Sequence, residues 1–156
     1  TLSKAIGVLG GFIAGPHELI EWLQNRGRPF LFSTSAPPAA VAACIEALDI
    51  IADEPERIDR LWSNTRTFKA GLHDLGFDTG ASETPITPVI TGDEERTQAF
   101  ANSLFDAGLF CPAIVCPTVG KGKARVRTIV TADHTEGDLG EALEVLGRVG
   151  AALGLR

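Results

Sequence analysis

The chain has 156 residues, of which 44% are hydrophobic and 22% charged, a composition typical of globular proteins. The formal net charge of −6 and the scattered lysines and arginines exclude the basic surface of a nucleic-acid-binding protein. No apolar run is long enough for a transmembrane helix, so we expect neither a nucleic-acid nor a membrane partner. The length suffices for a small domain together with the edge of another.

The first third of the sequence predicts one strand and two helices. Residues 5–15 are apolar and rich in glycine, which predicts a buried strand and turn. A helix is expected over residues 16–26, with proline at its first position and a glycine after its end. Residues 28–35 are expected to form a loop or a short extended segment. Pro37-Pro38 open a second expected helix, and its expected core face consists of Val41, Ile45, Leu48 and Ala52.

Glu54-Pro55 interrupts the helical pattern, and we place a domain boundary there, between residues 1–53 and 54–156. A long helix with an apolar stripe then runs to Gly76. Beyond it strands and helices alternate, which predicts an α+β domain with a small antiparallel or mixed sheet covered by helices. The expected elements are strands over 86–90, 109–116 and 124–131, a helix over 94–107, and a closing helix over 139–153 with Thr135 as its cap.

Cysteine and histidine usage predicts neither a disulfide framework nor a metal site. Cys44, Cys111 and Cys116 are odd in number and match neither a zinc nor a CxxC spacing, so we expect three reduced, mostly buried thiols. The three histidines have no partners at metal-ligand spacing. The sequence shows no signal peptide and begins inside a motif, so we expect a part of a longer cytoplasmic enzyme.

Lys4 stands in Thr1-Leu2-Ser3-Lys4, directly before the glycine-rich run. A lysine amine forms a Schiff base only when it is neutral, which requires a partly desolvated site. Taken alone, Ser-Lys is a weak signal, and an exposed lysine is the commoner case. Thr1 and the neighbouring glycines favour the interpretation as a reactive lysine.

Two further groups of residues suit the binding of anions. Ser33 and Thr34 precede a helix amino terminus, where hydroxyls, backbone amides and the helix dipole suit a phosphate; a plain N-cap is the alternative. Strand alternation places Arg125 and Arg127 on one face, so that one guanidinium can hold a carboxylate bidentately while the other pairs structurally. The alternative is a charged edge strand that discourages aggregation.

Four segments in the same order resemble the carboxy-terminal part of the α-oxoamine synthases. These are pyridoxal-phosphate (PLP) enzymes of the type I aminotransferase fold. The segments are Thr1-Leu2-Ser3-Lys4 with Gly10-Gly11; residues 28–34 with Pro37-Pro38; Thr87-Pro88-Val89; and residues 117–135, which include Ala124-Arg125-Val126-Arg127 and His134-Thr135.

The resemblance implies a fold and a role for each candidate residue. Residues 1–53 correspond to the end of the large PLP-binding domain, and residues 54–156 to the small carboxy-terminal domain. Lys4 matches the catalytic lysine that holds the cofactor, and Thr1 a hydroxyl near the cofactor phosphate. In this family's homodimer, the hydroxyls that match Ser33 and Thr34 reach the phosphate bound in the other subunit. Arg127 matches the arginine that binds the amino-acid carboxylate.

The resemblance also implies an acyltransferase that uses an amino acid and an acyl-coenzyme A. Residues 60–66 and 147–155 lean toward the glycine C-acetyltransferases, which make 2-amino-3-oxobutanoate and coenzyme A from glycine and acetyl-coenzyme A. The alternative is the 8-amino-7-oxononanoate synthases, which use alanine and pimeloyl-coenzyme A. A non-catalytic fragment or subunit, and a transaminase on the same fold, stay open.

Overall fold

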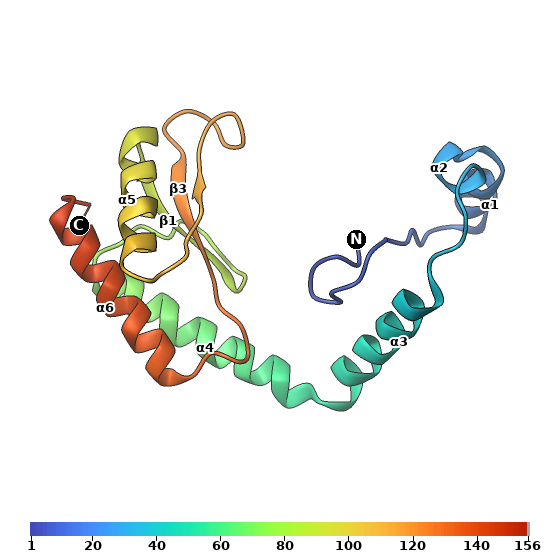
Figure 1. Cartoon of the computed structure of the whole chain (residues 1–156), viewed down its shortest axis with the longest axis horizontal. Coiled ribbons are helices and arrows are strands. Elements are labelled where there is room, and N and C mark those ends of the chain that lie inside the picture. The colour runs from blue at the N-terminus through green and yellow to red at the C-terminus, as the bar shows by residue number, and fades with distance from the viewer. Residues whose placement is uncertain (156) are drawn as a thin grey trace. The chain divides into compact units, whose positions relative to one another are not determined.

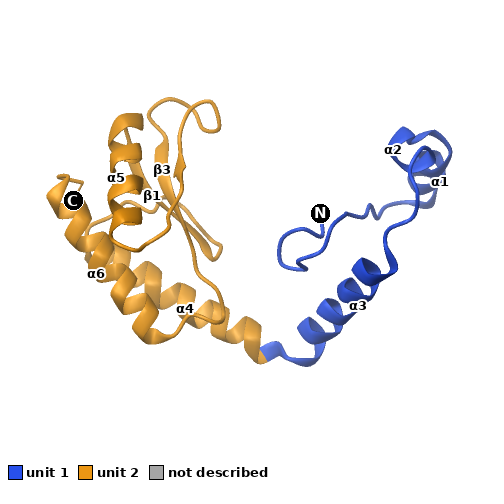
Figure 2. Cartoon of the chain, viewed as in Figure 1, with its two compact units in different colours: residues 1–55 blue, residues 56–156 orange. Residues whose placement is uncertain are grey.

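The structure is a computed structural model that describes residues 1–155. It divides between Pro55 and Glu56 into two compact units, coloured separately in Figure 2. We call residues 1–55 unit 1 and the residues from Glu56 onward unit 2. The division lies beside the Glu54-Pro55 break in the sequence pattern. The assignment of the two parts to a large and a small domain of the family fold stays a prediction.

Unit 1 contains three helices and a turn-rich amino-terminal segment (Figure 1). The first and third helices, α1 (His17–Arg26) and α3 (Pro38–Asp53), confirm the two predicted helices. The short helix α2 (Arg28–Leu31) lies where the sequence predicts a loop. Pro29 explains this difference, because a proline at the start of a helix presets its φ and lacks only an N–H that would be unpaired there.

The amino-terminal segment forms no strand, so the strand predicted over residues 5–15 is wrong. The segment folds back on itself instead: the Leu2 N–H donates to the Gly10 carbonyl at 2.9 Å, and the Val8 N–H to the Leu2 carbonyl at 3.1 Å. Gly7 and Gly10 have φ angles of +73° and +116°, a region that glycine adopts readily and that interrupts an extended strand. The apolar composition of residues 5–15 therefore led to the prediction of a buried strand. The backbone conformation of the glycines instead produces turns.

The three helices of unit 1 contain no buried residue. The residues of α3 that were expected to form a core face are exposed, so that expectation is wrong for the structure of residues 1–155. Phe12 and Trp22 are also exposed, at 73% and 61%. No layer within the described chain covers these apolar side chains, and unit 1 therefore has no hydrophobic core of its own.

Unit 2 is a three-stranded antiparallel sheet whose one face packs against helices (Figure 1). The strand order is β1-β3-β2. In chain order its elements are α4 (Pro55–Asp74), β1 (Ile86–Gly92), α5 (Glu94–Asp106), β2 (Ala113–Ile114), β3 (Ala124–Ile129) and α6 (Glu136–Ala152). These elements confirm the predicted α+β pattern and resolve its small sheet as antiparallel.

The core of unit 2 lies between this sheet and its helices. The fully buried apolar side chains come from all three helices and two strands: Leu72, Phe100, Leu104, Leu146, Val89 and Val126. Each such side chain contributes about 1.5–3 kcal/mol by leaving water. The described residues contain no helix that is both long and apolar enough to span a bilayer.

The strands differ from the sequence expectation mainly at β2. It comprises only two residues, although a strand was predicted over residues 109–116. Pro112 and Pro117 lie on either side of it, and a proline has no N–H with which to extend a ladder. Pro88 is tolerated in β1 because this strand lies at the edge of the sheet.

The ends of the helices of unit 2 follow the expected signals. Gly76 follows α4 with a φ of +83°, as expected of a residue that ends a helix. Asp93 caps α5 by accepting from the Arg96 N–H. Thr135 and Asp138 form a capping box at the start of α6, which confirms the predicted cap.

Candidate functional site

Lys4 lies in the turn-rich segment of unit 1. Its carbonyl accepts the Gly7 N–H at 3.0 Å, and its side chain is exposed. Within the described residues no strand forms to bury Lys4. Its desolvation in the complete protein stays a prediction. The exposed amine remains accessible to an aldehyde.

Thr1 shares this segment with Lys4. The hydroxyls of Thr1 and Ser3 are hydrogen bonded at 2.9 Å, and the Thr1 hydroxyl also lies 3.4 Å from the Gly10 carbonyl. The structure thus brings Thr1 and Lys4 into one loop whose backbone conformation depends on its glycines. Both side chains are exposed and stand three residues apart.

Ser33 and Thr34 lie between α2 and α3. They do not cap α3, because its N-cap residue is Pro37 and no side chain accepts a hydrogen bond there. The plain N-cap alternative is therefore wrong. The Ser33 hydroxyl donates weakly to the Thr34 carbonyl at 3.3 Å, and both residues are exposed. The structure leaves these hydroxyls accessible to a ligand.

Arg127 lies in β3 of unit 2, on the sheet face that the helices leave open. Burial alternates along this strand: Val126 and Thr128 are buried, Arg127 is exposed and Arg125 is half-buried. The predicted alternation is confirmed. The Arg125 Nε donates to the Lys123 carbonyl at 2.8 Å, which ties that guanidinium to its own loop. Arg127 is therefore the better candidate of the two for a substrate carboxylate.

The predicted site residues are divided between the two units. Thr1, Lys4, Ser33 and Thr34 belong to unit 1, and Arg127 belongs to unit 2. The chemistry of this set consists of one amine, three hydroxyls and one guanidinium, which suit an aldehyde, a phosphate and a carboxylate respectively.

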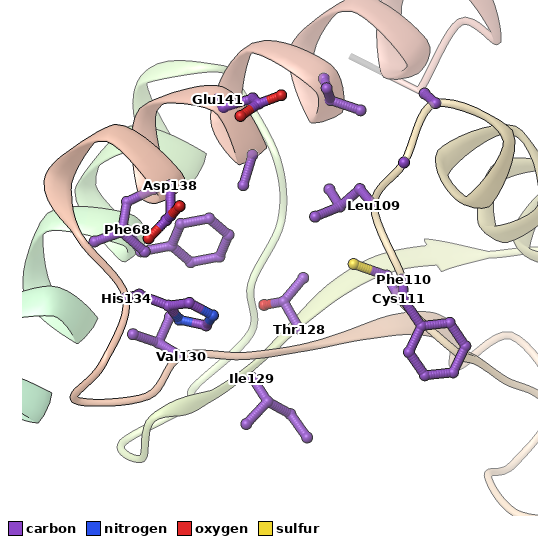
Figure 3. Close-up of a pocket in the computed structure, with 15 residues that line it drawn as sticks. Phe68, Leu109, Phe110, Cys111, Thr128, Ile129, Val130, His134, Asp138 and Glu141 are labelled. Atoms are coloured by element: carbon purple, nitrogen blue, oxygen red, sulfur yellow. The ribbon is translucent and has the colours of Figure 1, made fainter.

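Unit 2 also contains a cavity of about 410 Å³ that sequence reasoning did not predict (Figure 3). Phe68, Val130 and Leu139 provide part of its apolar wall. The imidazole of His134 lies beside Phe68 and Val130. The Nδ1 of His134 accepts the Thr131 N–H at 3.1 Å. The sequence alone assigned no role to this histidine. Its position directly before the Thr135 cap was the only local feature that could have pointed to it.

Two titratable groups beside this cavity have shifted pKa values. Burial raises the pKa of the Cys111 thiol to about 11, so this thiol stays protonated and unreactive at neutral pH. Hydrogen bonds from the backbone and the hydroxyl of Thr135 lower the pKa of Asp138. Both donors stabilise the carboxylate form, which completes the capping box of α6.

The three cysteines are free, but only one of them is buried. Cys111 is buried, Cys44 is half-buried and Cys116 is exposed, so the expectation of mostly buried thiols is wrong. Cys116 lies in the segment that joins β2 to β3. Among residues 1–155, no cluster of three or more histidine, cysteine, aspartate or glutamate side chains could hold a metal ion.

Comparison with known sequences relates nearly the whole chain to one family. The family model of aminotransferase class I and II matches residues 1–146. An 8-amino-7-oxononanoate synthase of Symbiobacterium thermophilum is 62% identical over 155 residues, and 8-amino-7-oxononanoate synthase 1 of Bacillus subtilis is 54% identical over 155. Each match covers 99% of this chain and 40% of the relative. The chain thus spans about 40% of the length of these relatives.

Comparison with solved structures gives the same family of folds. A serine palmitoyltransferase (SPT) with a PLP internal aldimine superposes with a TM-score of 0.92 at 31% identity, over 100% of this chain and 40% of that one. An 8-amino-7-oxononanoate synthase of Francisella tularensis superposes with a TM-score of 0.80 over 94% of this chain and 43% of that one. At 20% identity, the second likeness shows the fold alone.

Proposed function

The chain belongs to the aminotransferase class I and II family, and within it to the α-oxoamine synthases, and from this premise we propose that the complete protein is a PLP-dependent acyltransferase. Its substrates are an amino acid and an acyl-coenzyme A. The corresponding fold is that of the type I aminotransferases, of which this chain supplies the carboxy-terminal part. We also propose that the complete protein is cytoplasmic.

The proposed substrates are alanine and pimeloyl-coenzyme A. The single observation that carries this choice is the 62% identity to an 8-amino-7-oxononanoate synthase. The products are 8-amino-7-oxononanoate, carbon dioxide and coenzyme A, which balances the carbon atoms of the two substrates. The relatives reported above favour this pair over glycine and acetyl-coenzyme A, the pair that the sequence of residues 60–66 and 147–155 had slightly favoured.

Those two segments have structural positions that explain why they are poor guides to substrate. Residues 60–66 lie in α4, and residues 147–155 lie mostly in α6. Thr65 and Val149 in these segments are buried in the core of unit 2, and Asn64 donates to backbone carbonyls of the same unit. Their sequence therefore reflects packing within unit 2. Glycine C-acetyltransferase stays as the second candidate function.

The residues of this chain fit the cofactor by the chemistry of their exposed groups. Lys4 offers an accessible primary amine for the aldehyde of PLP, and Thr1 a hydroxyl for its phosphate. Ser33 and Thr34 offer two more hydroxyls that no helix cap occupies. We propose that the latter two bind the phosphate held by the other subunit of a homodimer.

When bound, PLP supplies an electron sink that stabilises negative charge at the substrate α-carbon. The chain's own residues perform the remaining tasks. Arg127 binds the substrate carboxylate through its guanidinium, which fixes the orientation of the α-carbon. The Nζ of Lys4 would hold the aldehyde of PLP and, when not bonded to it, would accept the α-proton of the substrate and return a proton to the product.

The homodimer is supported by the surface of unit 1. Its helices bury none of their residues, and large apolar side chains such as Phe30 and Phe32 are exposed at 66% and 78%. Exposed apolar surface of this kind marks an interface in a soluble protein. We propose that the rest of the enzyme and its second subunit cover this surface.

The proposed function is tested by supplying the complete protein and PLP with each substrate pair and measuring the release of coenzyme A. Alanine with pimeloyl-coenzyme A is expected to give the higher kcat/KM, with 8-amino-7-oxononanoate identified by mass. Preference for glycine with acetyl-coenzyme A would establish the second candidate. Bound PLP without thiol release from either pair would contradict an acyltransferase.

A further inference from the structure

The segment that leads into β3 carries a concentration of positive charge. Residues 107–132 contain no acidic residue but four cations, Lys121, Lys123, Arg125 and Arg127. The whole chain has 14 basic and 20 acidic residues, so the charge of this segment is opposite in sign to that of the chain. The proposed function uses only Arg127. It leaves the other three cations without an assigned role.

Lys121 and Lys123 lie on a tight turn directly before β3, in the loop that joins β2 to β3 (Figure 1). The Lys123 N–H donates to the Gly120 carbonyl at 3.0 Å, which closes the turn. Gly122 has a φ of +75°, as is required at the third position of a type II turn. A Cβ added at Gly122 would meet no atom within 4 Å, so the described chain does not cover the turn at this point.

The turn presents hydrogen-bond donors that have no partner. The backbone N–H groups of Lys121 and Gly122 donate to no backbone carbonyl of the described residues. The side chains of Lys121 and Lys123 are exposed, and neither forms an ion pair within residues 1–155. Two successive N–H groups of a turn beside two ammonium groups suit the oxygens of a phosphate.

Arg125 extends this set of donors along β3. Its Nε donates to the Lys123 carbonyl at 2.8 Å, which ties the guanidinium to the turn. The two terminal nitrogens of a guanidinium held in this way can still bind an anion. Arg125 is half-buried, so solvent and salt screen its charge less than those of the two exposed lysines. We call residues 120–123 together with Arg125 the basic turn.

The carboxylate that follows the neighbouring strand is engaged in another contact. Gly92 of β1 pairs with Ala124, and Asp93 comes directly after Gly92. The Asp93 carboxylate accepts the Arg96 N–H at 2.8 Å as the cap of α5. It forms no ion pair with the basic turn, whose cations are therefore available to a ligand.

The distance from the basic turn to Arg127 suits the acyl-coenzyme A of the proposed reaction. The carboxylate that Arg127 binds is attached to the carbon that attacks the thioester, so the thioester lies within a few bonds of that carboxylate. In coenzyme A about a dozen bonds separate the sulfur from the diphosphate, an extended length of about 15 Å. Lys123 lies four residues before Arg127, about 13 Å along an extended strand. The phosphates can therefore reach the basic turn while the thioester stays near Arg127.

We propose that the basic turn binds the phosphate groups of the acyl-coenzyme A. The inference rests on the proposed function and adds to it a phosphate subsite formed by unit 2 alone. Phosphate oxygens replace water at the two N–H groups of the turn, and the lysines and Arg125 offset the phosphate charge. Arg127 keeps its role at the amino-acid carboxylate. A thioester of pantetheine, which lacks these phosphates, does not contact the basic turn.

The test measures the dissociation constant of coenzyme A by calorimetry, with the complete protein loaded with PLP. Lys121→Ala and Lys123→Ala should each raise this constant about threefold and the double variant about tenfold, the size of effect that exposed ion pairs have. Arg148→Ala removes an exposed cation from α6 and is the matched control, which should bind coenzyme A as the wild type does. The substituted side chains are exposed, so all variants should fold, which circular dichroism checks.

A substrate without phosphates separates phosphate binding from other effects. In the double variant the KM of the acyl-coenzyme A should rise about tenfold, while the KM of the same acyl group on pantetheine should change less than about twofold. High salt should reduce the difference between wild type and double variant for the coenzyme A thioester, because it screens exposed charges. An equal rise in KM for both thioesters would overturn the phosphate subsite.

Further outcomes distinguish the inference from the proposed function. Wild-type affinity for coenzyme A in the folded double variant would overturn the inference and leave the proposed function intact. Binding of coenzyme A that the double variant weakens, without thiol release by the wild type from either substrate pair, would refute the proposed function and leave the phosphate site. A wild type that binds no coenzyme A would refute both. Tighter binding of heparin than of coenzyme A, lost in the double variant, would indicate a general polyanion surface and overturn the assignment to the coenzyme.

Discussion

Substitution of one buried glycine tests the packing of unit 2 quantitatively. Gly150 is a buried residue of α6, and a Cβ added there would lie 2.6 Å from Cζ and 2.9 Å from Cε1 of Phe77. The Phe77 ring is 4% exposed and its centroid lies 6.0 Å from that of Phe100, which is fully buried. The ring cannot yield without displacing the centre of the core.

The magnitude follows from two opposing effects. Alanine stabilises a helix interior by about 1 kcal/mol relative to glycine. Overpacking a rigid core costs about 1–3 kcal/mol. Because the Phe77 ring that the new methyl group would meet is itself held against Phe100, we place the cost of Gly150→Ala near the upper end of that range. The free energy of unfolding should fall by about 1–2 kcal/mol.

Gly71→Ala is the matched control. Its Cβ would meet the methyl groups of Leu143, a half-buried and flexible side chain that can rotate away. The helix preference of alanine should then offset the local shift, and stability should stay within about 0.5 kcal/mol of the wild type. The free energy of unfolding of both variants is measured by urea unfolding followed by far-ultraviolet circular dichroism. The comparison requires that the dependence of this free energy on urea concentration, the m value, is the same as in the wild type. Equal stability of the two variants would refute the packing argument.

Three shorter predictions address charge and chemistry. Because hydrogen bonding lowers the pKa of Asp138 in the folded chain, its contribution to stability is present at neutral pH and is lost as the pH falls through that lowered pKa. Asp138→Asn should therefore have a lower Tm than the wild type at pH 7 and the same Tm in strong acid. A difference in Tm that is constant with pH would contradict this. Because its pKa is raised to about 11, the thiol of Cys111 should not react with iodoacetamide in the native chain at pH 8, whereas the exposed Cys116 should react. Peptide mass mapping measures both, and equal labelling would contradict the burial of Cys111. Arg127→Lys should raise the KM for the amino acid about tenfold or more and change the KM for the acyl-coenzyme A little, because a lysine cannot bind a carboxylate bidentately. Steady-state kinetics measures both constants. An equal rise in both would contradict the assignment of Arg127 to the amino-acid carboxylate.

Most of unit 2 could be predicted from the sequence because its elements carry local signals. The apolar stripe of α4, the alternation in β3 and the Thr135 cap each depend on residues a few positions apart. The same alternation distinguished Arg127 on the open face from its buried neighbours. Local periodicity therefore sufficed wherever one face of an element packs against the core of its own unit.

The sequence was a poor guide where structure depends on glycine conformation or on distant partners. Residues 5–15 have the composition of a buried strand, but positive φ angles at Gly7 and Gly10 turn the chain back. The hydrogen bonds of Arg60 and Asn64 to the loop before α6 were not predictable either, because their partners are 67 to 72 residues away and backbone carbonyls carry no sequence signal. Contacts of this kind become visible only in the folded chain.

The assignment of Lys4 as the cofactor-binding lysine is the central claim and can be tested directly. The complete protein is incubated with PLP, reduced with borohydride and digested, and the labelled peptide is identified by mass spectrometry. We predict the phosphopyridoxyl group on Lys4 and its loss in Lys4→Arg. Lys69 is the internal comparison, since its Nζ already donates to the Ser82 carbonyl at 2.6 Å. Label on Lys69, Lys121 or Lys123 instead, or label that persists in Lys4→Arg, would contradict the claim.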